Sequence, residues 1–392
     1  KLALSSELIF DQLDAFFTPE FNILPITDAR CPQPEVFAGR GTEEGIDDNE
    51  GQVQVVSRQV VGPYDQAILE AESVEALRSW LQENNFQVPV AIDEKLGPYI
   101  EANAVFVAIK LLPGKTAGDI APLYLEFPSR IPSIPIIPTS IAAQKDMGVL
   151  VHIFSTNRAI PLNFLHVQIN EAALDFRSRG ANYQDVVAQA VDEADGHAFT
   201  TDFAGAVTAA FKESIYPLET NPIARNLTLL DLVPRNEADL ANGLWIDPDF
   251  RRIVAGYLET PDDFDIGSFW ATPFEYSDLL EQPIDFQAVA RLIDDEVNPA
   301  RRALLRQTRT MPYLTRLFTT MSAEEMTVDP LFAFNGDLGE VPRVRNIELH
   351  LNCDGDVEQV ITSDGRVVDL AVGSDNVIRR ENGATIAGTD TY

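Results

Sequence analysis

The sequence predicts an α+β protein: a mostly antiparallel sheet with packed helices in the N-terminal half, a helical second half and a short C-terminal β group. Three patterns lead to this fold class. Before residue 160, several short runs alternate apolar and polar residues or are rich in β-branched residues. From about residue 182 the apolar residues recur at helical spacing, and near residue 345 the pattern returns to that of strands.

The N-terminal half contains the clearest local signals. Residues 5–17 are expected to form a capped amphipathic helix that Pro19 ends, and the acidic, proline- and glycine-containing residues 28–51 indicate a loop. In residues 73–84, Val74, Leu77 and Leu81 share one face, which predicts a helix that packs on the sheet with Trp80 partly buried. A shorter helix is expected over residues 92–101. The expected strands of this single sheet are 52–61, 64–71, 103–112, 122–128 and 148–156.

The later elements follow from the same two periodicities. Four prolines from Pro128 to Pro138 favour an edge or an extended crossover. Ser363-Asp364-Gly365 marks a hairpin between two strands of the 345–370 group. The expected helices are 182–194, 201–216, 236–244, 248–258, 286–295, 299–308 and 312–320. The expected division is an α+β domain over residues 1–180, a mainly helical region over 181–340 and a β-strand segment over 341–392.

The charge of the chain restricts its partners. It has 392 residues, with 61 acidic against 29 basic side chains and a net charge of −32. Such a chain repels phosphate backbones and anionic membrane surfaces, so nucleic-acid binding is not expected. Only six of the basic residues are lysine. Salt adaptation and a GC-rich genome explain that bias equally well.

Two cysteines, Cys31 and Cys353, are too few and too far apart to make a zinc site. In an oxidising compartment they are expected to form a disulfide, and in the cytosol they would stay free. No apolar run approaches the ~20 residues that a membrane-spanning helix needs. The chain opens on Lys1 instead of Met, which suggests a processed or truncated start, before which an export signal would lie.

A calcium site is the metal site that the sequence offers. Asp354, Asp356 and Glu358 alternate across a tight turn, and calcium takes several such oxygen ligands. The full twelve-residue spacing is missing, and Asp-Gly also serves as ordinary turn chemistry. No cofactor is otherwise predicted.

Catalysis has no sequence signature. Phosphate-binding, nucleophile-elbow and zinc-protease motifs are missing from the sequence, and no two of the four histidines have the helical spacing of a metal site. His152 and His166 both sit in apolar, strand-like stretches, where a core imidazole is the ordinary interpretation. Whether the protein is an enzyme therefore stays open, with the balance against it.

Several stretches resemble a bacterial family known as domain of unknown function 2330. The most distinctive is residues 61–89, which begins Val-Gly-Pro-Tyr-Asp-Gln-Ala-Ile-Leu. The opening helix over residues 8–16 and the segment 96–110 are similar too, and residues 310–332 resemble a stretch of some larger members. The resemblance covers about residues 1–215. It implies an exported protein, normally with a signal peptide and with strands before the first helix that this chain lacks, and it implies no activity.

Three functional hypotheses follow. The first is a non-enzymatic subunit of the cell envelope or extracellular space, in the periplasm, on the cell surface or outside the cell, working with other protein subunits. A sheet without its upstream strands would expose an edge that accepts a strand from another chain. The second is a hydrolase-type enzyme, which a pocket of convergent polar groups would favour. The third is a calcium-dependent binding or adhesion module.

Overall fold

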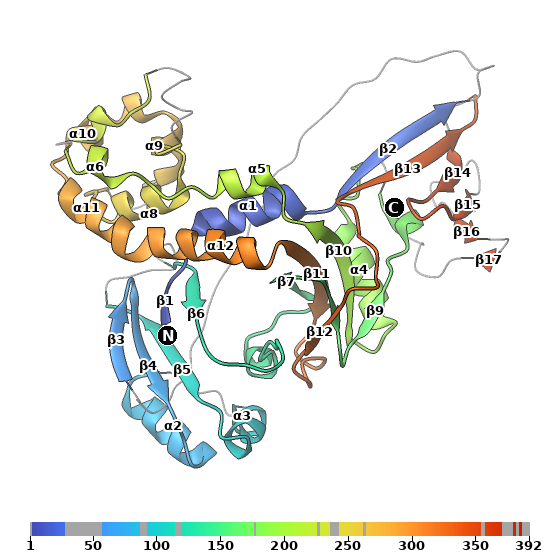
Figure 1. Cartoon of the computed structure of the whole chain (residues 1–392), viewed down its shortest axis with the longest axis horizontal. Coiled ribbons are helices and arrows are strands. Elements are labelled where there is room, and N and C mark those ends of the chain that lie inside the picture. The colour runs from blue at the N-terminus through green and yellow to red at the C-terminus, as the bar shows by residue number, and fades with distance from the viewer. Residues whose placement is uncertain are drawn as a thin grey trace.

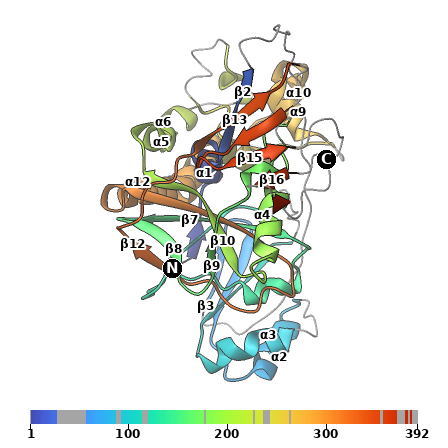
Figure 2. The same ribbon diagram turned by 90° about the vertical axis from the view of Figure 1, so that its right-hand side faces the viewer.

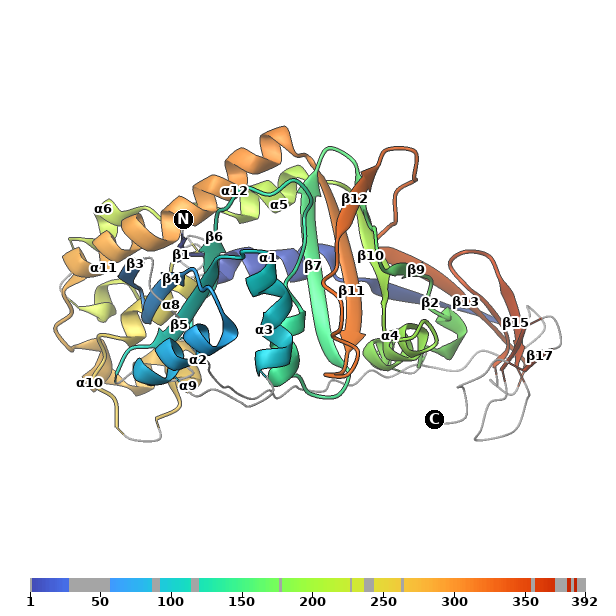
Figure 3. The ribbon, with the colours of Figure 1, turned by 90° about the horizontal axis from the view of Figure 1, so that it is seen from below.

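In the computed structural model the molecule is elongated, with a helical group at one end and a β-sheet at the other (Figure 1). The long helix α12 leads from the helical group to strand β11 of a central sheet, and the first helix α1 packs beside it (Figures 1 and 3). Within the part that the structure describes, no helix is both long and apolar enough to cross a membrane. The structure describes residues 2–27, 57–86, 92–113, 120–175, 178–225, 228–235, 243–261, 264–353, 357–370, 379–381 and 384–385.

The central sheet has the strand order β7-β11-β10-β9. Its first three strands are antiparallel, and β9 joins β10 in parallel. Helix α4 packs against β10 and β11 (Figure 2). A small sheet, β8 with β12, lies beside it. The bounds are β7 (Met147–Ser155), β8 (Arg158–Pro161), β9 (Leu165–Val167), α4 (Tyr183–Asp192), β10 (Ala198–Ala206), β11 (Tyr313–Met321) and β12 (Phe332–Asn335).

The expectation of a mainly helical second half is wrong, because strands are abundant in both halves. Residues 312–320 form strand β11 instead of a helix. Of the expected helix 201–216, residues 201–206 belong to strand β10, and the short helix α5 (Ala209–Ser214) follows. Nearly every residue of β10 and β11 is buried, so both faces are covered and the apolar–polar alternation typical of a half-exposed strand is lost. Their threonines, which are β-branched and favour strands, are the signal that helical spacing obscured.

The N-terminal half contains several sheets instead of the single one expected. Strands β3, β4 and β5 form an antiparallel sheet, β6 pairs with β1, and β7 belongs to the central sheet. Helix α2 packs on the three-stranded sheet through Leu77 and Leu81, with Trp80 partly buried, as expected, whereas Val74 is only half-buried. The bounds are β1 (Leu2–Leu4), α1 (Glu7–Phe17), β3 (Ser57–Val61), β4 (Tyr64–Leu69), α2 (Val74–Glu83), α3 (Ile92–Glu101), β5 (Phe106–Leu111) and β6 (Leu123–Leu125).

The C-terminal β group is confirmed, together with its turn between Thr362 and Arg366. The sequence did not reveal its edge strand, β2, which comes from the other end of the chain and pairs in parallel with β13. Pro25 within β2 fits an edge position, because proline cannot donate a ladder hydrogen bond. The bounds are β2 (Glu20–Thr27), β13 (Val344–Leu351), β14 (Val357–Ile361), β15 (Val367–Leu370), β16 (Arg379–Glu381) and β17 (Ala384–Thr385).

The helical group has its own apolar core, which includes Trp245, Phe250, Phe269 and Phe286. The helices expected over 248–258, 286–295 and 299–308 are present, whereas most of 236–244 lies outside the described residues. The bounds are α6 (Thr220–Ile223), α8 (Pro248–Ala255), α9 (Ile266–Ala271), α10 (Ser277–Leu280), α11 (Phe286–Leu292) and α12 (Asn298–Thr310), with a single π-type turn at Ile293–Val297.

A fully buried arginine ties this group to the first helix. Arg301 on α12 has no exposed surface. Its guanidinium binds Asp247 at 2.8 Å and Asp249 at 2.6 Å, and its Nε donates to Ser6 Oγ at 2.9 Å. Burial alone would raise the pKa of Asp249, but hydrogen bonds from Ser6 and Arg301 hold that pKa below its usual value. The cluster therefore joins α1, α8 and α12 through buried ion pairs and hydrogen bonds.

The carboxyl group of Glu7, beside this cluster, should make stability depend on pH. Burial raises its pKa from 4.5 to about 7, against the opposing charge of Arg252, 2.9 Å away, and with added repulsion from Asp249 and Asp11. The folded state holds this proton more tightly than the unfolded state does. The resulting contribution to the free energy of unfolding is therefore fully present below pH 4.5 and is lost as pH rises to about 7. We expect Glu7→Gln to remove this loss, which we put at about 2 kcal/mol for a partly exposed group.

Urea unfolding at pH 5, 6, 7 and 8 measures this effect as the difference between wild type and variant. The exposed Glu72→Gln is the matched control, and its free energy of unfolding should change with pH in the same way as that of wild type. If Glu7→Gln also ran parallel to wild type across this range, Glu7 would not be the group responsible.

Candidate functional site

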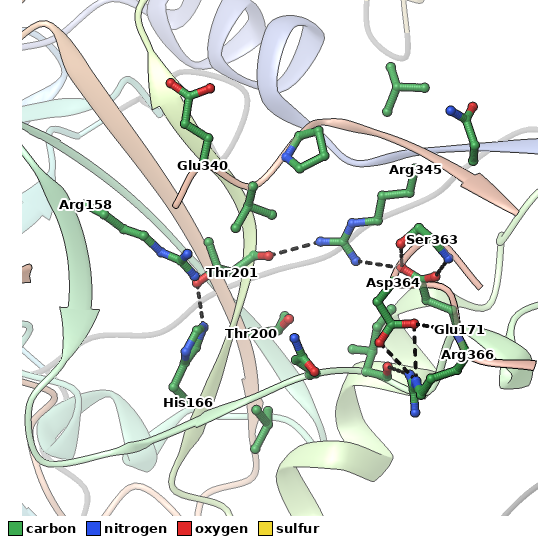
Figure 4. A pocket seen from close by; sticks show the side chains of 17 residues that line it. Arg158, His166, Glu171, Thr200, Thr201, Glu340, Arg345, Ser363, Asp364 and Arg366 are labelled. Carbon is green, nitrogen blue, oxygen red and sulfur yellow. Dashed lines mark hydrogen bonds and ion pairs between the residues drawn. The ribbon is translucent and has the colours of Figure 1, made fainter. Parts of the chain in front are cut away.

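A cavity of about 430 Å³ lies between the central sheet and the C-terminal sheet (Figure 4). Strands β8, β9 and β10 supply Arg158, His166 and Thr201 on one side, and β13 supplies Arg345 on the other. The turn between β14 and β15 closes the cavity with residues 363–366. The wall therefore combines segments that are up to about two hundred residues apart in the chain.

The side of the cavity nearest the C-terminal sheet is a network of paired charges. Arg345 donates from Nη2 to the carbonyl oxygen of Thr201 at 3.0 Å, and its Nη1 lies 3.7 Å from Glu171 Oε1. Glu171, which is 5% exposed, also accepts hydrogen bonds from the backbone and hydroxyl of Ser363, at 2.7 and 2.6 Å. Arg366 pairs with Asp364 at 3.0 Å. Each of these two arginines therefore has a carboxylate close by.

Arg158, at the other side, is different. Its side chain is 9% exposed, and its Nη1 donates to the carbonyl oxygen of Gly339 at 2.9 Å. Its Nε is buried and has no hydrogen-bond partner, and no carboxylate of the described residues forms an ion pair with it. Burial lowers its pKa, which reflects the cost of a charge in this place.

His166 and Thr201 form a close pair beside Arg158. Their Nε2 and Oγ1 atoms are 2.7 Å apart, as the dashed line in Figure 4 marks. Desolvation, and then the charge of Arg158, lower the pKa of His166, which favours the neutral form of the ring. Thr201 is itself 5% exposed. The pair offers a hydroxyl group and an imidazole to anything that enters the cavity.

The chemistry of these groups favours anions. A buried guanidinium without a carboxylate, next to hydroxyl groups, is a preformed donor set for an oxyanion. The same groups do not form a complete catalytic triad within the described residues, because no contact in the described part orients His166 from its other nitrogen. Binding is therefore the chemistry for which the arrangement is best equipped.

Of the residues predicted as metal ligands, only Glu358 lies in the described part of the chain, and it does not line this cavity. Asp354 and Asp356 lie outside the described residues, and Glu358 is exposed on β14. Across the described part of the chain, no group of three or more histidine, cysteine, aspartate or glutamate side chains is placed to hold a metal ion. With two of the three ligands outside that part, the calcium site stays a prediction.

The predicted disulfide also stays a prediction. Cys353 is exposed in the turn after β13, whereas Cys31 lies outside the described residues. The strand register between β2 and β13 is consistent with a bond between these two cysteines. Leu351 pairs with Thr27 at the ends of two adjacent parallel strands, and each cysteine follows one of these ends, by two and by four residues.

Sequence reasoning missed the arginines and misjudged His166. His152 is a buried core residue, and burial with the charge of Arg316 lowers its pKa to about 3. His166, which occurs in a similar apolar stretch, instead lines the cavity. The signal that was available is an arginine inside an apolar strand of an acidic chain, as at Arg158 and Arg345. Their convergence depends on long-range strand pairing that no local pattern shows.

Fold and site together define an α+β protein with a polar, arginine-lined cavity between two sheets. The chain belongs to the family described as "Uncharacterized protein conserved in bacteria (DUF2330)", whose model matches residues 1–219. The matched part includes Arg158, His166 and Thr201, whereas Arg345 and the turn at 363–366 lie beyond it. No curated protein and no solved structure matches the chain.

Proposed function

We propose that this chain is an exported, non-enzymatic protein of the bacterial cell envelope or extracellular space, which works by holding a small ligand in the cavity beside Arg158. The observation that carries the proposal is the buried charge of Arg158, which faces a polar cavity without a carboxylate of its own. Natural proteins retain such a cost mainly where function needs it. Export is supported by the resemblance described above and by the acidic composition.

Cell fractionation tests the export part of this proposal. An antibody against the chain should find the full-length gene product in the periplasm, at the surface or in the medium of the producing bacterium. Cytoplasmic and periplasmic marker proteins are the controls. Recovery with the cytoplasmic marker would contradict export without touching the cavity.

A hydrolase is the second candidate, because Thr201 Oγ1 lies within hydrogen-bond reach of His166. Chromogenic esters, phosphates and glycosides test it directly. Our proposal predicts no turnover above the buffer rate. Turnover that Thr201→Val abolishes, and that the exposed Thr310→Val leaves unchanged, would show an enzyme and contradict the non-enzymatic reading.

We also propose that other protein subunits bind this chain. Within the described residues, β2 pairs with β13 along one edge, and no described strand pairs with its other edge. An eight-residue edge of this kind can accept a strand from another chain. Light scattering of the protein purified from its own bacterium should give a mass at least twice that of its single polypeptide, as measured on the same sample under denaturing conditions. A mass equal to that of one chain at all concentrations would contradict the assembly.

A further inference from the structure

We propose that the ligand is a small hydroxylated molecule with one oxyanionic group, a carboxylate or a phosphate, and that Arg158 binds this group at the buried end of the cavity. This inference rests on the proposed function and adds the chemical class of the ligand. A carboxylate and a phosphate each present a pair of oxygens, and a guanidinium recognises such a pair through two parallel hydrogen bonds.

The charges around the cavity select Arg158 as the anion-binding group. Arg345 has Glu171 nearby, and Arg366 has Asp364, so each of these cations is compensated within the wall. Glu340 also lines the cavity, but it is exposed, and its carboxylate points away from Arg158 in Figure 4. The uncompensated positive charge is therefore at the Arg158 end.

The geometry at that end suits an anion that arrives without its water shell. Thr200 and Thr201 are 3% and 5% exposed, so the floor of the cavity is buried and an ion pair there is strengthened by low dielectric. The Nε of Arg158 is a buried donor without an acceptor, which a carboxylate or phosphate oxygen would satisfy. Of the three arginines that line the cavity, Arg345 and Arg366 have carboxylates beside them and Arg158 has none among the described residues, so a single anionic group matches the site.

The other residues that line the cavity indicate the chemistry of the rest of the ligand, beyond its anionic group. Gln168 and Asn346 are exposed residues of the lining and offer side-chain amide groups. These groups exchange hydrogen bonds with the hydroxyls of a ligand more readily than they contact a hydrocarbon. A volume of about 430 Å³ lies within the range of small-molecule sites. A sugar-sized molecule with one acidic group fits both the size and the polarity.

Calorimetric titration of the full chain with glucuronate, glucose 6-phosphate and glucose tests the inference and distinguishes the two anions. We expect at least one anion to bind, and glucose to bind at least about 10-fold more weakly. Arg158→Gln should weaken binding of that anion by at least about 30-fold, whereas Arg158→Lys should keep part of the affinity. The exposed Arg309→Gln removes the same charge elsewhere and should change nothing.

A thermal melt without ligand accompanies each variant and shows whether it folds. Because Arg158 carries a buried charge without an ion pair, Arg158→Gln should melt no lower than wild type. Failure of both anions to bind at up to about 10 mM, or unchanged anion binding in folded Arg158→Gln, overturns the inference. The proposed function survives that result if glucose binds with an affinity that Asn346→Ala reduces. It falls as well if none of the three probes binds.

Discussion

Replacing Arg301 by methionine should lower the free energy of unfolding by about 3–5 kcal/mol, because it leaves two buried carboxylates without their cation. Asp247 and Asp249 have no exposed surface, and Arg301 supplies hydrogen bonds of 2.6 to 2.8 Å to them. Arg301 Nε also donates to Ser6 Oγ, so the loss extends to the start of α1. Chemical denaturation at pH 7 measures the change.

Two further variants make this result specific. Arg302→Met removes an exposed charge from the same helix and should alter stability by less than about 0.5 kcal/mol. The double variant Arg301→Met with Asp249→Asn should lose less free energy of unfolding than the two single variants lose together. The reason is that Asp249→Asn removes a carboxylate that Arg301→Met has already left unpaired. An Arg301→Met protein as stable as Arg302→Met would contradict the structural role of the cluster.

Loss of the predicted Cys31–Cys353 disulfide should have a similarly large effect on stability. Adjacent strands lie about 4.8 Å apart, so cysteines that follow the paired residues Thr27 and Leu351 start from neighbouring positions. A bond that closes a loop of this length should stabilise the protein by roughly 4–5 kcal/mol in the chain-entropy model. We expect Cys353→Ser to lower the free energy of unfolding by about that amount when the protein is prepared under oxidising conditions.

Alkylation in denaturant checks the bond itself. The oxidised wild type should show no reactive thiol before reduction and two afterwards, and Cys353→Ser should show one. The double variant Cys31→Ser with Cys353→Ser should be no less stable than either single variant. Two reactive thiols in protein recovered from an oxidising compartment would exclude the bond.

The elements that the sequence predicted correctly are those whose signals are local. Helix α2 carries its apolar stripe and its Ser73 cap within one segment, and the turn at 363–365 carries its own Asp-Gly. Strands β10 and β11 were assigned to helices because both faces are buried, which removes the period of two. Strand β2 was missed because its partner, β13, is more than three hundred residues away.

The cavity was less predictable than the fold for the same reason. Arg158 and Arg345 face one cavity only because β8 lies beside the central sheet and β13 crosses to meet β2. The sequence shows each arginine inside a strand-like run but not which carboxylates compensate it. That difference, between Arg345 near Glu171 and Arg158 without an ion pair, is what points to a ligand.

The most direct test of this account is a crystal structure of the protein grown with whichever of glucuronate or glucose 6-phosphate binds. We predict an oxyanion in the cavity, with an oxygen about 2.7–3.2 Å from Arg158 Nε. Thr200 or Thr201 should lie within reach of the same group. A ligand bound elsewhere, with Arg158 turned onto a carboxylate of the chain such as Glu340, would contradict it.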